Sequence, residues 1–225
     1  GVPTFQVPGS GQFITTLRNT GYPIIPHFSE SEGHKIPGQV KNLMEVAQVD
    51  TFCAIGDSSQ PYFNVTPGKR DTPIKQWDMS FLDTVFGSTY LARLVKFYSQ
   101  YRGTVNCTLT FAGPAMATGK LLIAYTPPGT DPPTDRTNAM LGTHVIWDIG
   151  LQSSIKFSIP YISQTQYRFA NQQRTTLSYA GYISIFYQTG IVVPANTPNI
   201  CPITLMCSAG DDFVMRVATD NAYYQ

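Results

Sequence analysis

Strict alternation of apolar and polar side chains over residues 104–111 constrains the fold of this chain more than any other feature. Every odd position from 105 to 111 is apolar and every even position is polar. Because a β-strand points successive side chains to opposite faces, this pattern predicts a half-buried strand. A shift of one residue would bury the polar set instead. The core-facing side chains are expected to be Val105, Cys107, Leu109 and Phe111.

Similar patterns recur along the rest of the chain. They are clear at residues 76–81, 154–159 and 203–217, and less regular at 49–55, 120–126, 143–149 and 181–189. With 104–111 they make eight strands, joined by loops rich in Gly, Pro, Asn and Thr. Eight antiparallel strands with little helix predict an all-β fold, an eight-stranded jelly-roll β-sandwich.

Two short helices are expected between the strands. In residues 89–100 apolar side chains fall at i, i+3, i+4 and i+7, namely Leu91, Leu94, Val95 and Tyr98. This is helical spacing, and Ser88 or Thr89 is the expected N-cap. The second helix is expected at residues 135–141.

Residues 1–39 differ in character from the rest of the chain. They contain six Gly and five Pro and show neither a helical nor a sustained strand period. A solvated tail would be more polar than this segment, which carries many large apolar side chains. We therefore expect an extended N-terminal arm over 1–39, and a jelly-roll barrel with a short C-terminal tail over 40–225.

Charge is scarce in this chain. Fifteen Lys and Arg balance fourteen Asp and Glu, so the net charge is +1, and charged residues make up 13% against about 25% in typical soluble proteins. This excludes a nucleic-acid binder that depends on a basic surface. The 42% hydrophobic content excludes a disordered chain. No apolar run of about 18 residues occurs, so no membrane anchor is expected. Scarce charge and many aromatics suggest that partners cover much of the surface.

The four cysteines show no metal-binding or redox spacing. They are Cys53, Cys107, Cys201 and Cys207, and no pair is spaced as C-x-x-C. Cys107 and Cys207 alternate with polar neighbours inside strand-like runs. We expect all four to be free thiols that act as small buried hydrophobes, which suits a reducing, cytosolic folding compartment.

Each candidate catalytic pattern in the sequence lacks a residue or an element that its chemistry requires. Residues 113–120 look like a phosphate-binding loop, but Leu121 stands where Ser or Thr is needed and a strand follows instead of a helix. Gly56-Asp57-Ser58 follows an apolar strand, as in one class of hydrolase, yet no histidine has an Asp three residues before it. The three histidines do not form a metal-binding motif. They are His27, His34 and His144.

Neither the paired carboxylates nor the arginines form a pattern that predicts a catalytic or nucleic-acid-binding site. Asp211 and Asp212 are adjacent, so on a strand they would point to opposite faces and could not converge on one glycosidic bond. Glu30 and Glu32 lie in the irregular arm. Arg168 and Arg174, expected in a polar loop, are too few for binding a phosphate backbone. We predict no catalytic residue, no cofactor and no metal, and therefore no enzyme.

A set of short segments, taken in order, resembles the picornavirus capsid proteins. The segments are Ile36-Pro37-Gly38, Asn42-Leu43-Met44-Glu45, Tyr125-Thr126-Pro127-Pro128-Gly129, Ala139 to His144, Trp147 to Ser154, Ile159 to Ser163 and Tyr187-Gln188-Thr189. The start looks like the third capsid protein in particular, through Gly1-x-Pro3-Thr4, Pro8-Gly9-Ser10 and Gln12-Phe13. Each segment is weak by itself, but the ordered set covers the whole chain.

The resemblance implies a structural subunit of an icosahedral, non-enveloped capsid around a positive-strand RNA genome. Its implied partners are sister capsid proteins of the same polyprotein, joined in protomers and pentamers, and a host receptor that binds the outer surface. The genomic RNA would be enclosed, and the protein would be found in the virion after assembly in the host cytoplasm.

The resemblance also assigns roles to the two ends. In this family the N-termini of five copies meet under the fivefold axis. That role would fall on Gly1, Val2, Pro3, Thr4 and Phe5, as a site of self-association. Gly1 and Gln225 fit cleavage of a polyprotein at Gln–Gly bonds.

Two other functions suit a jelly roll, a carbohydrate-binding module and a hydrolase. The presence of the N-terminal arm, residues 1–39, distinguishes a shell protein from these two alternatives. Neither a lectin nor a hydrolase has a use for an apolar, non-helical arm, whereas a shell subunit does.

Overall fold

The computed structural model describes residues 40, 42–81, 84–170 and 178–219. The chain divides into two units, residues 1–39 and residues 40–225, and only the second contains described residues. The predicted arm, its interface residues Gly1 to Phe5, and Gln225 therefore lie outside the described residues.

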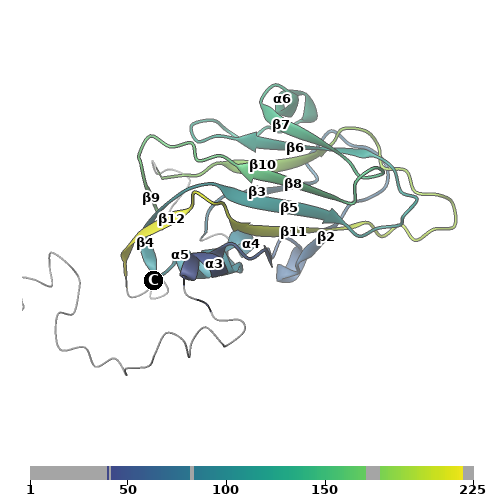
Figure 1. The fold of residues 1–225 in the computed structure, drawn as a ribbon. Helices are drawn as coiled ribbons and strands as arrows, with labels where there is room; N and C mark the ends of the chain where they lie inside the picture. Colours follow the sequence, from purple (N-terminus) through teal and green to yellow (C-terminus); the bar gives the residue numbers. More distant parts are fainter. Residues whose placement is uncertain (1–39, 41, 82–83, 171–177, 220–225) are drawn as a thin grey trace, which may run out of the picture. The chain divides into compact units, whose positions relative to one another are not determined.

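The described residues form a β-sandwich with a few short helices (Figure 1). The first sheet has the order β1-β11-β5-β8, and β2 also pairs with β11; the second has the order β3-β10-β6-β7. Every pairing is antiparallel. The strands of these two sheets are β1 (Thr51–Phe52), β2 (Tyr62–Asn64), β3 (Lys75–Asp78), β5 (Val105–Phe111), β6 (Lys120–Thr126), β7 (Thr143–Asp148), β8 (Ser154–Ile159), β10 (Tyr182–Tyr187) and β11 (Pro202–Ala209).

A third, smaller sheet lies at one end of the sandwich, on the left in Figure 1. Its order is β12-β4-β9, with β4 (Tyr98–Arg102), β9 (Arg168–Phe169) and β12 (Val214–Ala218). The helices are α3 (Leu43–Ala47), η1 (Asp57–Ser59), α4 (Thr84–Gly87), α5 (Tyr90–Val95) and α6 (Arg136–Met140). Helices α3 and α5 lie against the outer side of the β11 sheet, and α6 lies beside β7 (Figure 1).

The core lies between the two main sheets. The alternation of side chains in β5 determines which face of that strand points into the core. All four predicted side chains of β5 are buried, while the polar positions between them are partly exposed. Leu109 of β5 and Leu205 of β11 pair directly and are both fully buried. They pack in one cluster with residues of the opposite sheet, such as Trp77 and Trp147. The predicted facing of β5 and the predicted fold class are confirmed.

Helix predictions are confirmed in part. Helix α6 occupies the predicted segment, with Asp135 as its N-cap through a 2.7 Å hydrogen bond from the Asn138 N–H. Thr89 caps α5 by accepting a 3.1 Å hydrogen bond from the Ala92 N–H, as predicted.

The predicted end of the first helix at residue 100 is wrong, since α5 ends at Val95. Tyr98, which continues the helical spacing, belongs instead to β4, where it pairs with Ala218. Pairing with β12 on one side and β9 on the other engages the backbone of this segment in a sheet, so the helix does not continue.

The single strand predicted over residues 203–217 is two strands. Strand β11 pairs with β5, and after a turn β12 pairs with β4. Gly210 occupies that turn, where an added Cβ would lie 2.1 Å from the Thr104 Oγ1. Phe213, predicted in the strand, sits outside it and stacks on Tyr101 at a ring distance of 5.6 Å. The strands β2, β4 and β9 were not predicted from the sequence.

Candidate assembly surfaces

The segment that looks like a phosphate loop is a connection between strands. Residues 112–119 join β5 to β6, and Thr118 pairs with Val192 through backbone hydrogen bonds of 2.9 and 3.0 Å. The N–H of Lys120 donates to the Thr189 Oγ1 at 2.9 Å. These backbone groups are therefore engaged in holding two loops together, and a strand follows the segment, as predicted.

The other catalytic candidates are also not brought together. Ser58 is exposed in the η1 turn and has a left-handed φ of 56°. His144 lies on β7 at the edge of the other sheet, where its Nδ1 is 2.9 Å from the Gly142 carbonyl oxygen. His27 and His34 lie outside the described residues. Within the described part of the chain, no group of three or more His, Cys, Asp or Glu residues could hold a metal ion.

The two adjacent aspartates have different environments. The Asp212 carboxylate accepts hydrogen bonds from the Thr104 N–H at 3.1 Å and from the Thr104 hydroxyl at 2.6 Å. The hydroxyl bond, followed by the backbone bond, lowers the pKa of Asp212 below its usual value. Asp211 is exposed beside it in the same turn. The pair therefore closes a turn between β11 and β12, and Asp212 has a structural role there. Glu30 and Glu32 lie outside the described residues.

The prediction that Arg168 lies in a polar loop is wrong. Arg168 belongs to β9 and is only 3% exposed. One of its Nη atoms donates to the Ile162 carbonyl, and its guanidinium lies over the Tyr161 ring, 4.6 Å from the centroid. Arg168 pairs with the buried Tyr101 of β4, and the polar stretch that precedes it at residues 163–166 does not indicate this pairing. Arg174 lies outside the described residues.

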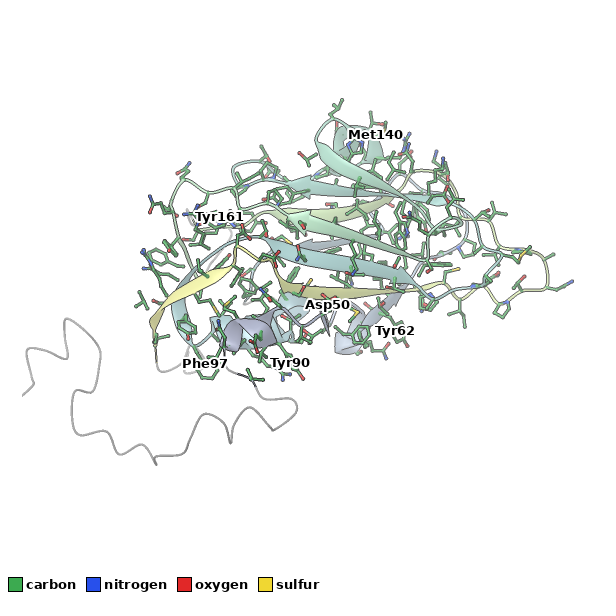
Figure 2. All side chains as sticks on the ribbon, viewed as in Figure 1. Asp50, Tyr62, Tyr90, Phe97, Met140 and Tyr161 are labelled. Atoms are coloured by element: carbon green, nitrogen blue, oxygen red, sulfur yellow. The ribbon has the colours of Figure 1, made fainter. Side chains whose placement is uncertain are left out.

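One exposed apolar surface is formed by α3, β1 and α5, and is here called the helical surface. Helix α5 buries Leu91, Ala92 and Val95, so its other side faces outward. The Tyr90 N–H donates to the Thr51 Oγ1 at 3.1 Å, which ties α5 to β1. Figure 2 shows Tyr90 and Phe97 projecting on the same side of the molecule. The large apolar side chains of this surface, each about half exposed, are Leu43, Phe52, Tyr90 and Phe97.

A second exposed apolar group lies where three loops meet, here called the loop end. Residues 112–119, 149–153 and 188–201 are joined there by backbone hydrogen bonds, including one of 3.1 Å from the Ile149 N–H to the Gly119 carbonyl. Met116 is 73% exposed, Leu151 is 84% exposed and Val192 is also exposed. The sequence alone did not single out these side chains, because the loops that carry them are far apart along the chain.

These surfaces suit contacts with other protein molecules. Contiguous exposed apolar side chains on a soluble protein mark sites of association, and aromatic and Met side chains are enriched in interfaces. No helix in the described part of the chain is long and apolar enough to cross a membrane. The fold and these surfaces define a jelly-roll protein that is built for assembly.

Comparison with known proteins identifies the family. The picornavirus capsid protein family, Rhv, matches residues 28–187. A genome polyprotein of Echovirus 16 (strain Harrington) is 42% identical over 238 residues, covering 100% of this chain and 27% of the polyprotein. A chain in a cryo-EM structure of rhinovirus-B5 has a TM-score of 0.84 and 35% identity, covering 100% of this chain and 99% of that chain.

The chain therefore belongs to the picornavirus capsid protein family. It is a structural protein of a non-enveloped, icosahedral capsid, and not an enzyme. It spans about a quarter of the length of the polyprotein that it matches.

Proposed function

We propose that this chain is the third capsid protein of its virus, and that it assembles with sister capsid proteins of the same polyprotein into protomers and pentamers. The observation that carries the proposal is the correspondence over whole chains with a rhinovirus capsid structure, at a TM-score of 0.84. The choice of the third protein rests on the likeness of residues 1–13 to that protein.

The exposed apolar side chains support assembly. An isolated soluble protein gains nothing from leaving Leu151 and Met116 largely exposed at the loop end. Burial against a neighbouring subunit would remove this surface from water, with about 25 cal/mol gained for each Å² of apolar area. The scarcity of charge supports the same conclusion, because the centres of protein interfaces are depleted in charged residues.

The proposed partners of the assembled particle follow from its place in a capsid. A host receptor would bind loops on the outer side. The genomic RNA would be enclosed without strong electrostatic binding by this chain, whose net charge is +1. Assembly would take place in the host cytoplasm, which agrees with four free thiols. The first five residues, Gly1 to Phe5, would associate with copies of themselves beneath the fivefold axis.

Co-expression with the sister capsid proteins tests the proposal. The complex should sediment as protomers and pentamers, and electron microscopy should show shells, whereas this chain alone should stay small. Leu151→Glu should reduce pentamer yield, because it places a carboxylate at the loop end, which a neighbouring subunit would bury in the proposed assembly. Leu141→Glu adds a carboxylate at an equally exposed leucine outside the loop end, so comparison of the two variants shows whether the loss is specific to the loop end. A chain that never sediments with its sister proteins, but binds an oligosaccharide, would be a lectin and would overturn the proposal.

A further inference from the structure

The outward face of the third sheet gathers arginine and aromatic side chains from three separate parts of the chain. Gln100 of β4 is flanked by Arg216 of β12 and by Phe169 of β9, because each pairs directly with it. Arg102, two residues along β4, lies on the same face as Gln100 and pairs with Val214. Except for Gln100, which is partly buried, these side chains are exposed, Phe169 at 59%. This surface is called the arginine face.

The two arginines of this face are held in place by tyrosines. The Arg216 guanidinium lies 3.6 Å from the Tyr167 ring centroid, and its Nε donates to the Gln100 Oε1 at 2.6 Å. The Arg102 guanidinium lies 5.9 Å from the Tyr161 centroid. Tyr161 lies at this end of the barrel in Figure 2. Stacking orders a guanidinium while leaving its charge and its other N–H groups available to a ligand.

Positive charge on the arginine face is not neutralised within the described part of the chain, where neither Arg102 nor Arg216 has a carboxylate within ion-pair distance. The pKa of Asp212 is lowered chiefly by its hydrogen bonds from Thr104 and to a smaller extent by the charge of Arg102. Behind the face lies a third guanidinium, that of buried Arg168, whose Nε has no hydrogen-bond partner. Pre-ordered guanidinium groups without counter-ions fit a ligand that carries carboxylates.

We infer that the arginine face docks an acidic, extended segment of a sister capsid protein, with a carboxylate bound by Arg216 and a second by Arg102. The inference rests on the proposed function, because it names the chemistry of one partner in that assembly. Arginine and tyrosine are the residues that most often dominate protein interfaces. The apolar side chain of Val214, on β12 itself, would pack against the docked segment.

The same observations disfavour RNA as the ligand. Two exposed guanidinium groups are too few to bind a phosphate backbone, which needs many contacts. A nucleic-acid surface would also carry further Lys and Arg across the sheet, whereas the cross-strand neighbours of Arg102 and Arg216 are Val214 and Gln100.

The geometry of the sheet gives the segment a place to lie. In the order β12-β4-β9, β12 is an edge strand of the described residues. An extended segment that runs along β12 could pair with its backbone and bring its carboxylates to the two arginines. Backbone pairing would supply affinity, and the arginines would select an acidic sequence.

Charge reversal tests the inference in the co-expressed complex. Arg102→Glu combined with Arg216→Glu should lower pentamer yield by about tenfold or more, because both changes place a carboxylate against a carboxylate. Lys69→Glu is the control, since Lys69 is exposed and lies outside the arginine face. Arg216→Lys keeps the charge but loses the planar guanidinium group that can bind a carboxylate through two hydrogen bonds. It should therefore lower the yield less than the double variant does. Assembly of the wild-type complex should also weaken with added salt, because screening affects these pairs.

A second measurement does not depend on any variant. Phenylglyoxal modifies accessible arginines, so mass spectrometry should find Arg102 and Arg216 reactive in the isolated chain and protected in the assembled particle. Equal reactivity in both states would overturn the inference. So would a double variant that assembles as well as Lys69→Glu, or one that assembles normally but loses packaged RNA, which would make RNA the ligand. A wild-type chain that does not assemble at all would overturn the proposed function itself.

Discussion

Cys107 of β5 and Cys207 of β11 lie directly opposite each other, with their sulfur atoms 3.3 Å apart. Both side chains are fully buried, and Cys53 lies beside them. Burial is the main reason why the pKa of the Cys207 thiol is raised well above its usual value, and contacts with Cys107 and Cys53 raise it further. The Cys207 thiol therefore stays protonated at neutral pH inside the core.

All four cysteines should be free in the fresh protein and should resist alkylation until the barrel unfolds. Burial shields all four thiols from the reagent, and a raised pKa also keeps Cys201 and Cys207 protonated, so native labelling should be slow at pH 7 and should not become fast at pH 8. Mass spectrometry after denaturation without reductant should find four labelled sites. A stoichiometric disulfide between Cys107 and Cys207 in fresh particles would show that the pair is oxidised in the virion.

Leu109→Ala should lower the free energy of unfolding by about 2–5 kcal/mol, because it leaves a cavity between the sheets. Thr108→Ala should cost less than about 1 kcal/mol, since Thr108 points to the other, partly exposed face of β5. Urea denaturation of the two variants measures both values. Equal losses would mean that the predicted facing of β5 is incorrect.

Asp212→Asn should destabilise the fold at neutral pH but not in acid. The folded state lowers the pKa of Asp212 below 3.8, so the charge contributes stability above that pH, and this stability is lost as the pH falls through the folded value. Asp212 is exposed, so solvent screening keeps the effect below about 1 kcal/mol. Denaturation at pH 7 and at pH 2 should show a difference between wild type and variant only at pH 7. A pH-independent difference would assign the effect to geometry instead of charge.

Deletion of residues 1–20 should leave the melting temperature of the barrel nearly unchanged, because the first strand in the described residues begins at Thr51. The same deletion should reduce pentamer formation with the sister proteins, if the proposed self-association of Gly1 to Phe5 is correct. Calorimetry and sedimentation measure the two effects separately. Normal assembly of the truncated chain, or unfolding of its barrel, would disprove the proposed role of the arm.

The sequence by itself determined the features that depend on neighbouring residues. The alternation in residues 104–111 settled which face of β5 is buried, because side chains alternate along any strand. Thr89 could be recognised as a candidate helix N-cap from its position before a short helical pattern. The prediction of no catalytic residue rests on residue types and spacing alone.

Only the tertiary structure decided the features that depend on which segments lie side by side. Tyr98 fits a helical period, yet pairing with Ala218 makes it part of a strand. Arg168 follows a polar stretch at residues 163–166, yet it belongs to β9, pairs with Tyr101 of β4 and is buried. The contact between Arg216 and Gln100 joins residues 116 positions apart. A local period records how a segment would orient its own side chains, but strand pairing is chosen by the whole core, so the arginine face could not be found before the third sheet was seen.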